Sequence, residues 1–174
     1  MKLKEICSYL DSAIPLSIQE SYDNSGLQTG DPDAEIESAL LSLDATEEVI
    51  EEAAGTGSGL VITHHPVIFH PVKSLTGRTK AEKIIARAIK NNIAVYSSHT
   101  SLDARTGGVS IKMAEKAGLV NIRVLKPLEN SLVKLVTFVP ADYAEKVREA
   151  IFKAGAGVIG NYDMCSYNVE GYGT

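Results

Sequence analysis

The sequence predicts an α/β fold in which a largely parallel sheet carries helices on both faces. Short apolar segments with the length of buried strands occur at 39–43, 59–63 and 93–96. Segments with apolar residues at helical spacing alternate with them along the chain. This alternation is typical of parallel sheets, because the crossover to a parallel neighbour needs a connection long enough for a helix.

One helix and one loop are predicted before the first of these strands. Four apolar residues recur at helical spacing: Leu3, Ile6, Leu10 and Ile14. Pro15 ends this helix, because proline cannot continue the ladder of backbone hydrogen bonds. The segment 22–27 is rich in turn-forming residues and therefore predicts a loop.

Each later helix of this region follows a predicted strand. Thr46 has the residue type of an N-cap, and Glu47 and Glu48 would occupy the first turn, where the helix dipole favours negative charge. The next helix is marked by five apolar residues on one face: Ala81, Ile84, Ile85, Ala88 and Ile89. A further helix begins near Val109 and ends at Gly118.

The domain boundary is predicted near Ser131. Residues 1–130 would form the α/β lobe. The remainder is predicted to form half of a ferredoxin-like α+β unit, with strands at 132–139 and 162–169 around a helix at 144–154. Half of such a sheet has open edges, so we expect that the chain is cut short within this unit or that a partner completes it. We also expect the chain to self-associate or to be poorly soluble.

Composition and charge exclude several classes of protein. Apolar residues make up 44% of the chain and charged residues 22%, which excludes a disordered chain, a collagen and a coiled coil. No apolar run approaches the ~20 residues of a membrane span. The net charge is −5 and no long basic run occurs, which disfavours broad binding to nucleic acid. Cys7 and Cys165 form no CxxC pair, which is typical of a cytoplasmic protein.

Polar side chains capable of binding metal follow two of the predicted strands. His64 and His65 come after the strand at 59–63, and His99 and Asp103 come after the next strand. Ligands of open α/β sheets lie beyond the carboxyl ends of the strands, so these groups are expected at one edge. Imidazole and carboxylate ligands suit zinc, iron and similar divalent ions. Because adjacent strand residues point to opposite faces, His64 and His65 can share a site only if the strand end twists. Partly buried, hydrogen-bonded histidines are the structural alternative.

Other polar residues have plainer interpretations. Asp23 and Asn24 are more typical of turns than of ligands, and His70 is interpreted as a loop residue. Asp44 follows the first strand, where it either takes part in the site or caps the next helix. The segment 105–108 either holds an anion or simply begins a helix.

Three segments together resemble a known family. They are Tyr-Asp-Asn-Ser-Gly-Leu-Gln at 22–28, Ile-Thr-His-His-Pro at 62–66 and Ser-His-Thr-Ser-Leu-Asp at 98–103. In this order they resemble the Ngg-one-interacting-factor-three-like family, also called the GTP cyclohydrolase I type-two homologues. That family often has Trp where this chain has Tyr22 and Asn where it has Ser101.

The resemblance implies a dinuclear metal site between two related α/β lobes. It implies metal ligands at His64, His65 and Asp103 for two divalent ions (zinc, manganese or iron), with His99 beside the site as a catalytic proton carrier. The family completes the site with a His-x-x-x-Glu motif near its C-terminus, whereas the four histidines of this chain all lie at or before position 99. The resemblance also implies that residues 131–174 begin an inserted domain similar to PII and copper-tolerance-A proteins, and that intact members form homo-oligomers, namely hexamers.

Three functions follow as hypotheses from the residues and the resemblance. The first is hydrolytic opening of the GTP ring, and the second is metal-dependent hydrolysis of another nucleotide or phosphate ester. The third is a non-enzymatic metal-binding scaffold or metal-trafficking protein.

Overall fold

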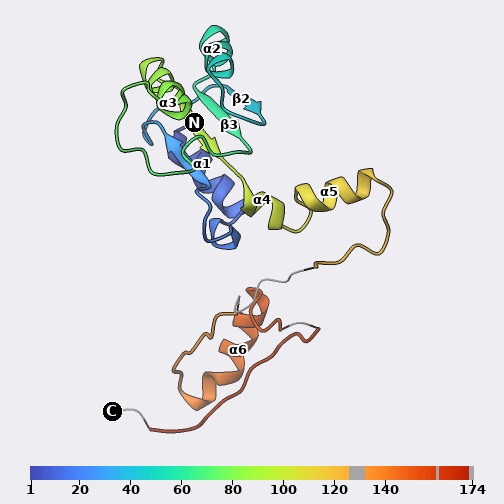
Figure 1. Cartoon of the computed structure of the whole chain (residues 1–174). Helices are drawn as coiled ribbons and strands as arrows, with labels where there is room; N and C mark the ends of the chain where they lie inside the picture. Colours follow the sequence, from blue (N-terminus) through green and yellow to red (C-terminus); the bar gives the residue numbers. More distant parts are fainter. Residues whose placement is uncertain (126–131, 160, 173–174) are drawn as a thin grey trace. The chain divides into compact units, whose positions relative to one another are not determined.

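The computed structural model describes residues 1–125, 132–159 and 161–172 (Figure 1). The chain divides into two compact units, Met1–Leu125 and Lys126–Thr174. The domain boundary expected near Ser131 lies outside the described residues. Among the residues described, none of the helices combines the length and the apolar character that crossing a membrane requires.

A four-stranded sheet forms the centre of the first unit, in the order β1-β4-β3-β2. Its strands are β1 (Gly26–Thr29), β2 (Ala39–Ser42), β3 (Leu60–Thr63) and β4 (Ala94–Ser97). β2, β3 and β4 are parallel, which confirms the predicted strands and their direction. β1 was not predicted, and it pairs antiparallel with β4. It lacks the apolar run that indicated the other strands, since it consists of Gly, Leu, Gln and Thr.

Helices cover both faces of this sheet, as predicted. α1 (Leu3–Ala13) packs on one face, where Leu3 contacts Leu60 and Tyr96. α2 (Glu47–Thr56) and α3 (Lys80–Lys90) pack on the other face, around Val61 and Val95. Successive residues of β3 and β4 thus enter opposite apolar clusters, as the pleat of a strand requires.

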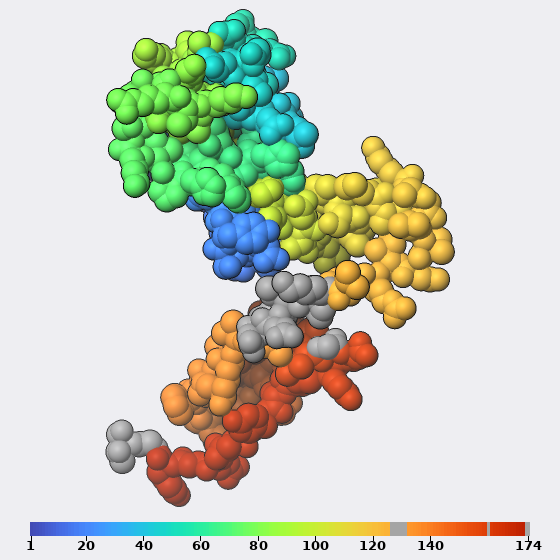
Figure 2. All heavy atoms as spheres, viewed as in Figure 1, coloured from blue at the N-terminus to red at the C-terminus, as the bar shows by residue number. Residues whose placement is uncertain are grey.

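Three shorter helices complete the first unit: η1 (Leu16–Ile18), α4 (Thr100–Ala104) and α5 (Val109–Lys116). α4 begins directly after the segment that follows β4 and contacts η1. α5 has no buried residue, and Figure 2 shows it in yellow extending from the rest of this unit. The sheet edge, α4 and η1 are the elements that build the candidate site.

Thr46 caps α2 as the sequence predicts. Its Oγ1 accepts a hydrogen bond of 3.2 Å from the backbone N–H of Val49. Replacing Thr46 with Ala removes this acceptor, and we expect the free energy of unfolding to fall by about 1 kcal/mol. Urea unfolding measures this loss. Ser74→Ala, in the exposed loop before α3, is the control and is expected to change stability by less than about 0.5 kcal/mol. Equal effects of the two substitutions would contradict the capping role.

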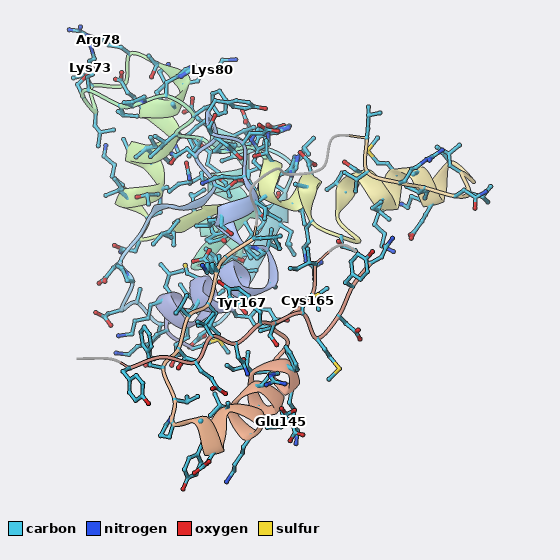
Figure 3. All side chains as sticks on the ribbon, turned by 90° about the horizontal axis from the view of Figure 1, so that it is seen from below. Lys73, Arg78, Lys80, Glu145, Cys165 and Tyr167 are labelled. Atoms are coloured by element: carbon cyan, nitrogen blue, oxygen red, sulfur yellow. The ribbon has the colours of Figure 1, made fainter. Side chains whose placement is uncertain are left out.

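The second unit contains the predicted helix but not the predicted strands. α6 (Ala144–Lys153) follows η2 (Ala141–Tyr143). The described residues at 132–139 and 162–169 form no strand, because no ladder partner lies beside them. Figure 3 shows Cys165 and Tyr167 on the extended segment after α6 and Glu145 on the helix itself. No described residue of this unit is buried. Its half-ferredoxin arrangement and the self-association of the chain stay predictions.

Candidate metal centre

Three segments that are far apart in the sequence meet at one edge of the sheet. The parallel strands β3 and β4 end there, so His64, His65 and His99 follow them at the same edge. β1 runs in the opposite direction, so the residues that precede it reach this edge as well. A hydrogen bond confirms the convergence, because the backbone N–H of His99 donates to the side-chain oxygen Oγ of Ser25 at 3.1 Å.

A bend at the end of β3 places two adjacent histidines on one side. The backbone N–H groups of His64 and His65 both donate to the carbonyl oxygen of Leu43, at 3.2 and 3.0 Å. Two successive N–H groups cannot face one strand neighbour in a regular ladder, so the strand has ended and twisted here. The ring centroids of His64 and His65 are therefore only 4.9 Å apart. This is the twist that a shared site requires.

His99 completes a group of three imidazoles. One ring nitrogen from each of His64, His65 and His99 lies within 4.8 Å of those of the other two. The His99 ring centroid is 5.3 Å from that of His64 and 5.5 Å from that of His65. We call these three residues the imidazole group. Whether His99 lies beside bound metal or ligates it stays a prediction.

Asp103 lies next to the imidazole group, one helical turn into α4. Its Oδ1 is 3.6 Å from Nε2 of His64. It is not a member of the group of mutually close ligand atoms. A ligand role for Asp103 stays a prediction, and a carboxylate in this position can join the imidazoles at a cation.

Each imidazole uses Nδ1 for a hydrogen bond to an oxygen. The partners are the Ser98 carbonyl for His64 (2.9 Å), Asp44 Oδ1 for His65 (2.8 Å) and Asp23 Oδ1 for His99 (2.9 Å). Carbonyl and carboxylate oxygens only accept, so in a neutral ring Nδ1 carries the proton and Nε2 keeps its lone pair. Three imidazoles held in this way are prepared to accept a metal ion or a proton.

Asp23 is the most deeply buried ionisable side chain of the site, with none of its surface exposed. Burial alone raises its pKa, but hydrogen bonds from the Thr100 hydroxyl, from His99 and from the Asn24 and Thr100 backbones outweigh burial. The net result is a pKa well below the usual range for aspartate. The sequence interpretation of Asp23 as a turn former is incomplete, since the side chain also bonds to His99 and to Thr100 at the start of α4.

The structure decides between the two alternatives for Asp44 and places His70. Asp44 bonds to His65, whereas Thr46 supplies the cap of α2, so Asp44 belongs to the site. His70 lies outside the imidazole group, exposed in a loop beside Phe69, which agrees with its interpretation as a loop residue.

The loop after β3 is fastened to the segment around β1. Asn24 Nδ2 donates to the Ile68 carbonyl at 2.6 Å, and the Ile68 N–H donates to Gln28 Oε1 at 3.1 Å. These bonds hold Phe69 near His99, with ring centroids 6.1 Å apart. Asn24 and Gln28 therefore stabilise the loop that carries Phe69 beside the imidazole group.

Three acidic side chains adjoin the imidazole group. Asp23, Asp44 and Asp103 lie against its rings. The basic side chains labelled in Figure 3, of Lys73, Arg78 and Lys80, extend outward from the loop before α3 and from its first turn. Because three carboxylates lie against the imidazole group, the local charge favours a cation.

Comparison with known sequences identifies relatives along almost the whole chain. The family described as Duf34/NIF3 (NGG1p interacting factor 3) matches residues 1–168. A protein of Halalkalibacterium halodurans named GTP cyclohydrolase 1 type 2 homolog is 44% identical over 161 residues, covering 92% of this chain and 43% of its own length. The Bacillus subtilis protein of the same name is 37% identical over 172 residues, covering 98% of this chain and 46% of its own length.

Solved structures give the same result. A Bacillus cereus protein related to NIF3 is similar over 99% of this chain and 48% of its own, with a TM-score of 0.77 and 39% identity. Reduced HcgD from Methanocaldococcus jannaschii is similar over 70% of this chain and 48% of its own, with a TM-score of 0.64 and 35% identity. The chain thus spans less than half the length of these relatives.

Proposed function

The chain belongs to the Duf34/NIF3 family, and from this premise we propose that it binds divalent metal ions and contributes to a hydrolase acting on GTP or another nucleotide. The observation that carries the proposal is the imidazole group, whose three ring nitrogens lie within 4.8 Å of one another. Relatives named GTP cyclohydrolase 1 type 2 homolog supply the substrate class. Because the chain spans less than half of their length, turnover is proposed for the complete protein.

The donor set fits a divalent ion. Each imidazole keeps Nε2 free because Nδ1 is already bonded to an oxygen. Imidazole nitrogen together with carboxylate oxygen suits zinc, manganese and iron. His64, His65 and Asp103 would hold two such ions, through imidazole nitrogens and a carboxylate.

The residues of the site would divide the work of hydrolysis. A divalent ion held here would supply Lewis-acid chemistry, which polarises an oxygen of water or substrate. His99 would accept a proton at Nε2 and return it to the leaving group, since its ring is held from behind at Nδ1. Phe69 would exclude water from the side of the site next to His99.

Elemental metal content of the purified chain tests the binding part of this proposal. We expect bound divalent metal in the wild type and at least a tenfold loss in a His64→Ala, His65→Ala double variant. His70→Ala is the matched control, because it removes the one histidine outside the imidazole group. Equal metal content in the wild type and the double variant would refute binding at this group.

Turnover is tested on the complete protein. Release of product from GTP, set against a panel of generic phosphate esters, separates ring opening from phosphoester hydrolysis. Tight metal binding without turnover of either substrate class would refute the hydrolase and support the metal-binding scaffold.

A further inference from the structure

Asp23 is the residue that holds the His99 ring from behind at Nδ1, at the edge of the sheet where β1 begins and β4 ends. Its Oδ1 accepts from Nδ1 of His99 at 2.9 Å, between residues 76 positions apart. We propose that Asp23 is a positioning residue that holds His99 in the Nδ1–H tautomer, so that Nε2 presents its lone pair to His64 and His65. The tautomer of His99 is independent of the proposed function. Only the use of Nε2 to accept a proton during hydrolysis rests on that function.

The Asp23 carboxylate is itself held from several directions. Oδ1 also accepts from the backbone N–H of Asn24 at 2.7 Å. Oδ2 accepts from Ser25 Oγ at 3.0 Å, from the Thr100 N–H at 3.0 Å and from the Thr100 hydroxyl. Because every partner is a donor and the side chain is fully buried, the group must stay an ionised acceptor.

A role in a local turn does not account for these contacts. A turn-forming aspartate bonds to backbone groups one to three residues away, as Asp23 does with Asn24. The bonds to His99 and Thr100 instead join the segment before β1 to the segment after β4. Ser25 adds a second brace, since its hydroxyl donates to Asp23 and accepts from the backbone N–H of His99. Both the ring and the backbone of His99 are therefore fixed from the same side.

The pair formed by Asp44 and His65 provides an internal comparison. The two side chains are 55% and 46% exposed, so water can replace the Asp44 carboxylate as the acceptor for Nδ1. The Asp23 side chain has no exposed surface, and His99 is 20% exposed. The tautomer of His99 should therefore depend on its carboxylate much more strongly than the tautomer of His65.

Exchange of Asp23 for Asn should reverse the tautomer. Three donors face Oδ2, from Ser25 and from the backbone and hydroxyl of Thr100, whereas only the Asn24 N–H faces Oδ1 besides His99. The single amide oxygen therefore turns to Thr100, and the amide NH₂ faces Nδ1 of His99. Nδ1 then becomes the acceptor, and the proton moves to Nε2. In carboxylate–histidine pairs of serine proteases, the same exchange gives the wrong tautomer.

Long-range ¹H–¹⁵N correlation spectra of the metal-free, full 174-residue chain measure the tautomer directly. The spectra are recorded at mildly alkaline pH, and the His99 signals are identified by their loss in His99→Gln. We expect the Nδ1–H form in the wild type and the Nε2–H form in Asp23→Asn. Asp44→Asn should leave His99 unchanged. So should Thr100→Val, which removes a hydroxyl from the same carboxylate but keeps the imidazole contact.

An Nε2–H form of His99 in the wild type would overturn the proposal, as would an unchanged Nδ1–H form in Asp23→Asn. A switch in Thr100→Val would assign the effect to general disturbance of the loop and would also overturn it. If Asp23→Asn does not fold, the wild-type spectrum decides. Because the spectra need no metal, absence of metal binding would remove the proposed function without changing this result.

Discussion

Zinc is expected to raise the thermal unfolding midpoint of the first unit by about 5–10 °C when it is present at 100 times its dissociation constant. An ion that binds only the folded chain stabilises it by about 2.7 kcal/mol at that concentration. The folded state alone brings His64, His65 and His99 together, since they come from segments after two different strands. Zinc is the probe because it binds imidazole nitrogen more tightly than manganese or iron does.

Differential scanning calorimetry with and without zinc measures this shift. The His64→Ala, His65→Ala double variant should lose it, while its midpoint without zinc stays close to that of the wild type. His70→Ala should keep the full shift, because His70 is outside the imidazole group. A shift of equal size in the double variant would place the zinc elsewhere on the chain.

Exchange of Asp23 for Asn is expected to lower the free energy of unfolding at neutral pH by about 2–4 kcal/mol. The carboxylate accepts hydrogen bonds from both the backbone and the hydroxyl of Thr100, from Ser25 and from His99. An amide offers one oxygen in place of two, so at least one donor is left facing an NH₂ group in a buried place. Hydrogen bonds to a charged acceptor are also stronger than those to a neutral one.

The effect of this exchange should depend on pH in a defined direction. Hydrogen bonding lowers the pKa of Asp23 in the folded chain below its ordinary value of 3.8. The stabilisation is therefore fully present above about pH 5 and is lost as the pH falls through the folded-state pKa. Urea unfolding from pH 7 to pH 3 should show the wild type and Asp23→Asn converging toward acid. A difference that stays constant over this range would show that the charge of Asp23 contributes nothing.

The sequence predicts those helices and strands whose own residues carry a recognisable pattern. Strands β2, β3 and β4 are apolar runs, and α2 carries its cap and first-turn acids within three residues. His64, His65 and His99 could be placed at one edge because parallel strands end together. The strands expected in the second unit had the same local signal. They do not form because a strand also needs a partner, which no local signal supplies.

Local sequence signals do not identify Asp23 as a residue of the site. The strand that brings it to the site is four residues long, begins with glycine and has no apolar run. Its partner β4 lies about 70 positions later in the chain, and only their antiparallel pairing turns the residues before β1 toward the site. The motif at 22–28 pointed to the family, but its residues resembled an ordinary turn. The link between Asp44 and His65 was likewise hidden, because it depends on the pairing of β2 with β3.

The strand order also determines when the site can assemble during synthesis. Among the strands that the structure describes, β1 is made first, yet its neighbour in the sheet is β4, which is made after the other three. A growing chain therefore carries Asp23 without its partners until His99 and Thr100 have emerged. Contacts between such distant residues form late, because the cost of closing the intervening loop comes first. The site assembles only after β4 has been made and has paired with β1. A metal ion would therefore bind to the folded unit and not to the chain during its synthesis.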